Sequence, residues 1–373
     1  MNKILHIVTH DVPWPVVHGG FFDLFYKLVA LHKSGVQIHL HCYKSKNGKE
    51  APELEKYCHS VKYYERNIGI KNVSFSIPYI VHSRNSHDLY TELKKDLYPV
   101  LLEGIHCTAL LDSDMMAGRK VFVRLHNIEY KYYRQLEKNE HNFFKKLYFK
   151  HESDLLKKYE RNIAKKATFL AVNADDANEY KIKLGANVFM LPVFLPWKEI
   201  KTHAGQGCFC LYHGNLSINE NEEAVTWLLN NVFKNTKIPL VIAGRNPSAK
   251  LISLLDKLPQ ICLVINPSEK EMQDLVIKAQ IHVLPSFNNT GVKLKLLNAL
   301  FNGRHCIVND AAVAGSGLSD CCNIANNASE FKHFISALYQ HSFTKEEIQD
   351  RADVLTKIYD NEKNVQRLMS LIW

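Results

Sequence analysis

The sequence predicts an α/β protein made of two Rossmann-like, doubly wound domains. Three observations support this fold class. The chain has 373 residues, which is more than one ordinary hydrophobic core accommodates. Short apolar runs alternate with helical patterns along most of its length. The alternation is interrupted once, where two prolines and a polar connector fall within residues 189–207, and it then resumes.

The first half of the chain opens with a βαβ unit. Residues 3–9 and 36–43 are predicted to be strands, and residues 19–35 the helix between them, so the sheet should be parallel. The loop before the helix lacks a GxGxxG pattern, which argues against a dinucleotide-dependent dehydrogenase. Gly19 and Gly20 still place free backbone N–H groups beyond the carboxyl end of a strand, where open α/β sheets bind ligands.

The composition predicts a folded protein without a membrane span. Hydrophobic residues make up 46% of the chain and charged residues 23%, and no apolar run reaches the length of about 18 residues that a membrane span needs. The first apolar run is too short for a signal peptide, so we expect a location in the cytoplasm. The nine cysteines lack the paired CxxC spacing of a zinc site, so we expect structural or incidental thiols.

The net charge of +9 suggests three kinds of partner: nucleic acid, an anionic membrane surface or a phosphorylated small molecule. Residues 130–166 concentrate lysines among tyrosines and phenylalanines, a pattern typical of a helix that lies on a membrane surface. The alternative is an ordinary surface helix whose aromatic side chains pack inward. No nucleic-acid-binding signature accompanies the charge, so we do not expect nucleic acid as a partner.

Residues 286–310 contain the pattern that points most directly to a ligand. They predict a glycine-containing turn after a strand, then a helix and a second strand. Asn289 and Thr290 are the candidate N-cap residues, and Gly303 lies where a terminal glycine would end the helix.

The turn itself has the parts of a phosphate site. Gly291 allows a ligand to approach the backbone, and Lys293 or Lys295 adds a full positive charge to the helix N-terminus. Lys295, Asn298 and Asn302 should share one helix face, so Asn298 could hydrogen-bond a neutral group such as a ribose hydroxyl. The alternative is a solvated helix face beside an ordinary βα turn.

Five stretches in series resemble one known family: GGFFDLFYKLVALHKSG, VRLHNIEY, LYHGNLSINENEEAVTWL, VIAGR and LPSFNNTGVKLKLLNALFNGRHCIVN. Together they resemble the retaining nucleotide-sugar glycosyltransferases of family 4, which have the GT-B fold. The resemblance implies two domains that face a central cleft and transfer of a sugar with retention at the anomeric carbon, without a required metal. It also implies an acceptor domain at 1–197, a nucleotide-sugar domain at 198–355 and a final helix at 356–373 that packs back on the first domain.

Three family positions are matched. Gly19 and Gly20 occupy the place of the loop that faces the donor diphosphate. His126 matches the histidine near the donor sugar, although a lone histidine at a strand end is commonly structural. Arg245 matches a residue that reaches the nucleotide, and its alternative role is a surface cation at a loop.

Other family positions differ. Thr290 and Asn298 stand where members commonly have two glutamates. Asn215 stands where an arginine is usual, and the usual lysine after it is also missing. The diphosphate would therefore lack two cations, and the turn formed by Gly291, Val292, Lys293 and Lys295 supplies candidate replacements. The resemblance thus assigns Thr290 to a sugar hydroxyl and Asn298 to the ribose.

The function expected from the sequence is transfer from a nucleoside diphosphate sugar to a saccharide or lipid-linked saccharide, in polysaccharide biosynthesis. The basic helix adds peripheral contact with the inner face of an anionic membrane. Three alternatives stay open: a sugar-nucleotide epimerase or phosphorylase of the same fold, a nucleotide-sugar-binding protein without catalysis, and a membrane-surface adaptor that binds through the basic helix.

Overall fold

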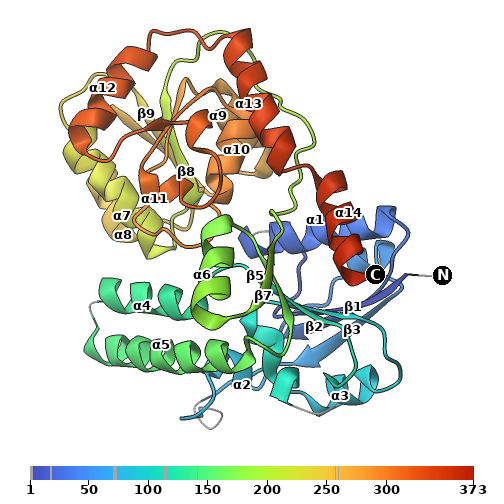
Figure 1. Cartoon of the computed structure of the whole chain (residues 1–373). Coiled ribbons are helices and arrows are strands. Elements are labelled where there is room, and N and C mark those ends of the chain that lie inside the picture. The colour runs from blue at the N-terminus through green and yellow to red at the C-terminus, as the bar shows by residue number, and fades with distance from the viewer. Residues whose placement is uncertain are drawn as a thin grey trace. The chain divides into compact units, whose positions relative to one another are not determined.

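The computed structural model describes residues 3–16, 19–69, 74–112, 116–140, 142–256, 258 and 260–373. Residues 17 and 18 of the predicted glycine-containing loop lie outside these ranges. The contacts divide the chain into unit 1, Met1–Pro196 with Tyr359–Trp373, and unit 2, Trp197–Ile358 (Figure 1). Each unit contains an all-parallel sheet with helices, which confirms the predicted doubly wound α/β class.

Unit 1 is built on a seven-stranded sheet with the order β3-β2-β1-β4-β5-β6-β7. Its strands are β1 Ile4–Thr9, β2 Gln37–Lys44, β3 Ser60–Glu65, β4 Val100–Glu103, β5 Val121–Leu125, β6 Thr168–Ala171 and β7 Asn187–Met190. Its helices are α1 Gly19–Lys33, α2 Tyr79–His82, α3 His87–Leu93, α4 Glu129–Asn139, α5 Phe143–Ile163, α6 Ala174–Leu184 and α14 Asn361–Ile372, with 3₁₀ turns at Pro52–Lys56 and Ile105–Asp112.

Alternating side chains of these strands fill two apolar cores, one on each face of the sheet. On β5, Val123 and Leu125 join the core covered by α2, α3, α5 and α6, whereas Phe122 joins the core covered by α1 and α14. Arg124 shares the face of Phe122, so its guanidinium is directed toward α1. The period of two along β5 therefore places a charge beneath α1.

Two predicted helices are each divided. The basic segment 130–166 forms two helices, α4 and α5, because Asn142 caps the second by accepting a hydrogen bond from the N–H of Lys145 at 3.1 Å. The C-terminal segment is not helical throughout. Asp360 caps α14 after α13 ends, and the side chain of Asn361 exchanges hydrogen bonds of 3.0 and 2.7 Å with the backbone of Leu195.

Unit 2 has a six-stranded sheet with the order β10-β9-β8-β11-β12-β13. Its strands are β8 Cys210–Asn215, β9 Leu240–Arg245, β10 Ile261–Ile265, β11 Ile281–Val283, β12 His305–Val308 and β13 Asn323–Ile324. Its helices are α7 Asn219–Trp227, α8 Ala249–Leu255, α9 Glu269–Lys278, α10 Leu294–Asn302, α11 Asp310–Val313, α12 Ala328–Leu338 and α13 Lys345–Ile358, with a π-helical segment at Leu228–Val232 and a 3₁₀ turn at Ser319–Cys321.

Gly303 ends α10, but for a different reason from the one the sequence suggested. Its φ is −109°, an extended conformation, so no left-handed turn requires glycine here. A Cβ atom at this position would lie 1.9 Å from Nε2 of the buried His282. The glycine is therefore required by the close approach of a packed side chain.

We expect Gly303→Ala to destabilise the protein by about 1–3 kcal/mol, because His282 must move within a packed core. Chemical denaturation would measure the loss. Gly20→Ala is the matched control, since a Cβ there meets no atom within 4 Å. Equal midpoints for both variants would contradict this explanation of Gly303.

Candidate functional site

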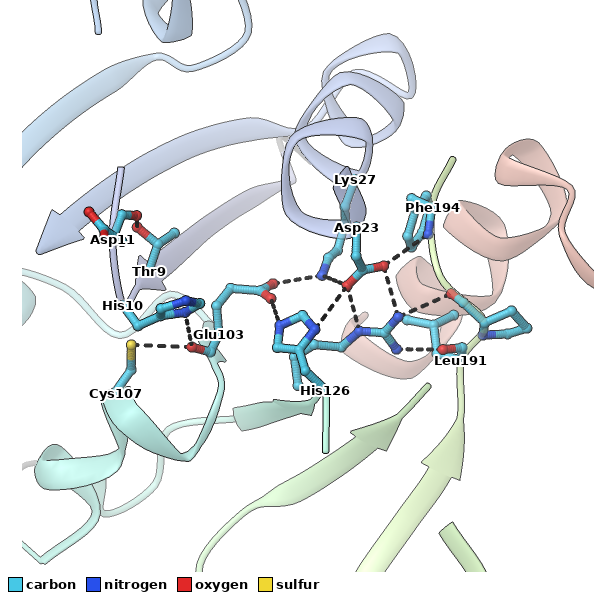
Figure 2. Close-up of polar contacts among 12 residues, drawn as sticks. Thr9, His10, Asp11, Asp23, Lys27, Glu103, Cys107, His126, Leu191 and Phe194 are labelled. Carbon is cyan, nitrogen blue, oxygen red and sulfur yellow. Dashed lines mark hydrogen bonds and ion pairs between the residues drawn. The ribbon is translucent and has the colours of Figure 1, made fainter. Parts of the chain in front are cut away.

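Unit 1 collects charged side chains where β4 and β5 end. Asp23 and Lys27 lie one turn apart on α1, Glu103 is the last residue of β4, and Arg124 and His126 lie at the end of β5. Figure 2 shows Asp23, Lys27, Glu103 and His126 pointing toward one another. These five residues, called here the buried charge network, are almost completely shielded from solvent except for His126, which is 17% exposed.

The buried charge network pairs two carboxylates with two cations. The ammonium of Lys27 lies 3.0 Å from Oδ2 of Asp23 and 2.7 Å from Oε1 of Glu103. Arg124 donates through Nε and Nη2 to the two oxygens of Asp23, each at 2.9 Å, in a bidentate arrangement. Asp23 also accepts the backbone N–H of Phe194 at 2.9 Å. The formal charges of these four side chains cancel.

Neighbouring cations keep both carboxyl groups ionised despite burial. Burial alone would raise the pKa of Asp23, but Arg124 and Lys27 outweigh it and hold that pKa well below its usual range. For Glu103, burial likewise acts to raise the pKa, and Lys27 and His126 lower it overall. The network is therefore a fixed set of charges.

His126 is held at the exposed edge of this network. Its Nε2 lies 3.2 Å from Oε2 of Glu103, and its Nδ1 lies 3.8 Å from Oδ2 of Asp23. Asp23, Glu103 and His126 offer three ligand atoms within 4.8 Å of one another, a spacing compatible with a metal ion. However, the ammonium of Lys27 already contacts both carboxylates and would repel a second cation. The arrangement suits orientation of the imidazole better than metal coordination.

Sequence reasoning found His126 but missed its four partners. A signal was available for three of them. Asp23 and Lys27 are charged residues at i and i+4 within an otherwise apolar helix, and Arg124 interrupts the apolar run of β5. Glu103 had no such signal, because its four-residue strand was not recognised.

Unit 2 contains a second cluster, around the ammonium of Lys295 on α10. This group donates to the hydroxyl of Tyr212 on β8 at 3.0 Å and to Oδ1 of Asn221 on α7 at 2.9 Å. It also lies 4.8 Å from the centre of the Tyr212 ring, within cation–π distance. We call Lys295, Tyr212, Asn221 and Lys293 the lysine cluster. In the described part of unit 2, Lys295 forms no ion pair.

The environment of Lys295 disfavours its charged form. Burial, followed by the nearby charge of Lys293, lowers the pKa of Lys295 to about 7, while Glu220 acts weakly in the opposite direction. One buried oxygen of Glu220, Oε1, has no hydrogen-bond partner among the described residues. The hydrogen-bond partners of Lys295 are neutral groups, so a bound anion would favour its charged form.

The turn before α10 is organised by its own side chains. Oδ1 of Asn288 accepts the backbone N–H of Thr290 at 2.7 Å and its hydroxyl at 2.8 Å. Gly291 has φ +64°, and the ammonium of Lys293 donates to the carbonyl oxygen of Thr290 at 2.7 Å. The half-buried Val292 lies between them. The glycine is needed here for its left-handed backbone.

The predicted N-cap of α10 is wrong. The helix begins at Leu294, and its N-cap is Lys293 rather than Asn289 or Thr290; the Lys293 side chain makes no capping hydrogen bond to the helix. Thr290 is buried and uses its hydroxyl within the turn, and Asn289 is exposed. The first N–H groups of α10 therefore have no side-chain cap, which leaves them available to an anion.

The structure connects Asn215 to the lysine cluster through Asn221. Nδ2 of Asn221 donates to the carbonyl oxygen of Asn215 at 2.8 Å, and the Asn215 side chain accepts from the N–H and hydroxyl of Ser217. Arg245 is the register partner of Asn215 on the adjacent strand. Its side chain is exposed and has no polar partner among the described residues. Both residues thus lie at the carboxyl end of the sheet.

The remaining predicted residues are separated between the two units. Oδ1 of Asn298 accepts from Nδ2 of Asn302 at 2.9 Å, so these two asparagines are neighbours on α10 as predicted. Gly19 and Gly20 form the first residues of α1 in unit 1, the helix that carries Asp23. The predicted set thus contains a group in unit 2 around Lys295 and a group in unit 1 around His126.

Comparison with known proteins supports sugar transfer. Residues 208–341 match the family Glycosyl transferases group 1. A Klebsiella pneumoniae protein, described as an uncharacterized 44.6 kDa protein in cps region, is 29% identical over 387 residues, which cover 97% of this chain and 98% of the relative.

Several solved structures, among them a glycosyltransferase, share the fold at low sequence identity. TarM superposes with a TM-score of 0.67 at 10% identity, covering 100% of this chain and 99% of TarM. Anabaena Alr3699/HepE, solved with UDP and glucose, has a TM-score of 0.66 at 10% identity and covers 99% of each chain. A glycosyltransferase from Rickettsia africae has a TM-score of 0.64 at 14% identity, with coverage of 100% and 97%. The chain has the GT-B fold.

We expect Glu103→Gln to lower the free energy of unfolding by about 3–5 kcal/mol, because it leaves Lys27 with one buried partner instead of two. Nitrogen NMR of His126 should also change, since its Nε2 faces Glu103. Glu92→Gln, which breaks more exposed ion pairs with Lys62 and Lys95, should cost less than about 1 kcal/mol. Indistinguishable denaturation midpoints would count against the buried charge network.

Lys295 should make stability depend on pH in a defined direction. Its pKa is about 7 in the folded protein and 10.5 as the ordinary value, so the unfolded chain binds more protons between these limits. The free energy of unfolding should therefore rise with pH across this range, by up to about 1.4 kcal/mol per pH unit from this group. Lys295→Met should lose that contribution, whereas the exposed Lys250→Met should retain it. Parallel pH profiles for wild type and Lys295→Met would exclude a lowered pKa.

Proposed function

We propose that this protein transfers a sugar from a nucleoside diphosphate sugar to a saccharide or lipid-linked saccharide, with retention of configuration at the anomeric carbon. One observation carries the proposal. The lysine cluster holds a partly desolvated ammonium at the carboxyl end of a parallel sheet, beside an uncapped helix N-terminus and without a carboxylate partner among the described residues. An anion with two phosphates satisfies both features at once.

Different residues of unit 2 bind different parts of the donor in this proposal. Lys295 and Lys293, the first N–H groups of α10 and the backbone at Gly291 bind the diphosphate. Asn298 hydrogen-bonds a ribose hydroxyl from further along the helix. Asn215 and Arg245, at the ends of β8 and β9, contribute to the same anion and its nucleoside. Thr290 and the Val292 backbone contact the transferred sugar.

The chemistry follows from the leaving group. As the bond between the anomeric carbon and the diphosphate oxygen breaks, negative charge develops on the phosphate, and preorganised ammonium and N–H groups stabilise it. The acceptor hydroxyl forms the new bond on the same face, and its proton passes to the departing phosphate oxygen. Two lysines supply the positive charge, so the proposed reaction requires no metal. In unit 1, the buried charge network holds the imidazole of His126 in one orientation.

The setting proposed for this reaction is polysaccharide biosynthesis. The Klebsiella relative is named for a cps region, and it aligns along nearly the whole of both chains. That name is the observation that favours a saccharide acceptor.

We expect Lys295→Met to reduce kcat by roughly 100- to 1000-fold, as removal of one preorganised donor does in other enzymes. A thermal-shift screen with UDP, GDP, ADP and their sugars would first identify the donor, because a ligand of the folded state raises the melting temperature. Turnover is then the release of the nucleoside diphosphate, and Lys250→Met in the same unit is the control.

Three outcomes would contradict the proposal. Wild-type kcat in Lys295→Met would remove the role of the lysine cluster. An epimerised sugar nucleotide formed without acceptor would favour the epimerase alternative. Proton NMR of the product should show the anomeric configuration of the donor, and inversion would overturn the retaining mechanism.

A further inference from the structure

The start of α5 is exposed in a way that the rest of the helix is not. Every residue from Asn142 to Tyr148 is exposed, as is Lys150, and the apolar side chains among them are uncovered: Phe143 is 66% exposed, Phe144 79%, Leu147 50% and Tyr148 38%. Further along, Leu156 and Ile163 of the same helix are fully buried. An apolar patch confined to one end of a helix marks a surface that binds something.

The exposed aromatic and leucine side chains form one stripe. Phe143 and Leu147 follow one another at i and i+4, and Phe144 and Tyr148 repeat this spacing beside them. Phe149, on the other side of the helix, packs toward Tyr133 of α4, with ring centres 6.1 Å apart. Figure 1 shows α4 and α5 side by side. The stripe is therefore directed away from α4.

A second segment extends the stripe. Phe75 is 83% exposed, and the centre of its ring lies 6.1 Å from that of His151, which follows Leu147 by one turn. The stripe ends there, because Asp154 and Lys158 are the next exposed residues of α5 in this direction. We call Phe75, Phe143, Phe144, Leu147 and Tyr148 the apolar stripe.

Lysines flank the stripe on both sides. Lys145 lies along one edge, and Lys146 and Lys150 lie along the other, as the helical spacing requires. None of the three forms an ion pair with a described residue. The exposed Asp154 nearby is 3.7 Å from Arg134, so its charge is already partly compensated. The patch is thus apolar at its centre and positive at its edges.

We propose that the apolar stripe inserts into the interfacial region of an anionic lipid bilayer while Lys145, Lys146 and Lys150 contact the lipid phosphates. The surface of such a bilayer has an apolar acyl boundary beneath a layer of charged phosphates. Aromatic side chains and leucine on one helix face suit the acyl boundary, and the lysines beside them suit the phosphates. A second copy of the chain fits less well, because a symmetric contact through the stripe would bring the same lysines together. No described helix is both long and apolar enough to cross a membrane. This inference rests on the proposed function and deepens it. A protein held at the bilayer surface reaches an acceptor that is linked to a lipid there.

Vesicle flotation tests the inference without any transferase assay. The full chain is mixed with vesicles of phosphatidylcholine alone or with added phosphatidylglycerol. We expect binding to the anionic vesicles, weaker at high salt. The double change Phe143→Ser with Phe144→Ser should weaken binding at least tenfold. Replacement of Lys145, Lys146 and Lys150 by glutamine should weaken it about fivefold per residue.

Ile182→Ser is the matched control, since Ile182 is 80% exposed on α6 of the same unit and lies outside the stripe. It should bind vesicles as the wild type does. Equal binding by all variants, or binding to neutral vesicles that the lysine changes leave intact, would overturn the proposal. Self-association that the phenylalanine changes abolish would assign the stripe to a second copy instead. Because donor binding can be followed by thermal shift in every variant, failure here is distinguishable from failure of the proposed function.

Discussion

The desolvated ammonium of Lys295 is the constraint on which the functional account depends. A cation removed from water is costly unless an opposite charge accompanies it. In the buried charge network of unit 1, the two cations have two carboxylate partners, so the charges balance and the network is complete. In unit 2, the partners of Lys295 among the described residues are a hydroxyl, an amide oxygen and an aromatic ring. The first arrangement orients a neighbouring residue, whereas in our proposal a bound anion completes the second.

Both clusters arise from the same property of parallel sheets. The carboxyl ends of neighbouring strands meet at one edge, together with the N-termini of the helices that follow. Glu103 and Arg124 reach unit 1's edge from β4 and β5, and Tyr212 approaches Asn221 because β8 leads into α7. The apolar interior of each sheet gives these polar groups a fixed place and a low dielectric, which strengthens their interactions. Fold and site therefore depend on each other.

The sequence predicted much of this architecture because apolar periodicity is a local property. Glycine and lysine in the turn at 291–295 were also visible locally, since their spacing alone suggests a phosphate site. What could not be predicted were the partners supplied by distant segments. Asn221 joins Asn215 to Lys295 through side-chain contacts that no local pattern encodes.

The prediction at Thr290 was wrong, and the reason for glycine at position 303 differed from the expected one. Threonine is a common N-cap residue, but the hydroxyl of Thr290 donates to Oδ1 of Asn288, and α10 begins four residues later. Gly303 ends α10, and glycine is required there because the buried ring of His282 on β11 leaves no room for a Cβ atom. A local side-chain hydrogen bond decided the first case, and a tertiary contact decided the second.

Isothermal titration calorimetry of nucleoside diphosphate binding tests the central claim most directly. Near pH 8 the free protein should hold Lys295 largely uncharged, since its pKa is about 7, and a bound diphosphate should restore the charge. Titrations in buffers of different ionisation enthalpy should therefore reveal uptake of about one proton in the wild type and none in Lys295→Met. Binding without proton uptake, or the same uptake in both proteins, would show that the diphosphate is held elsewhere.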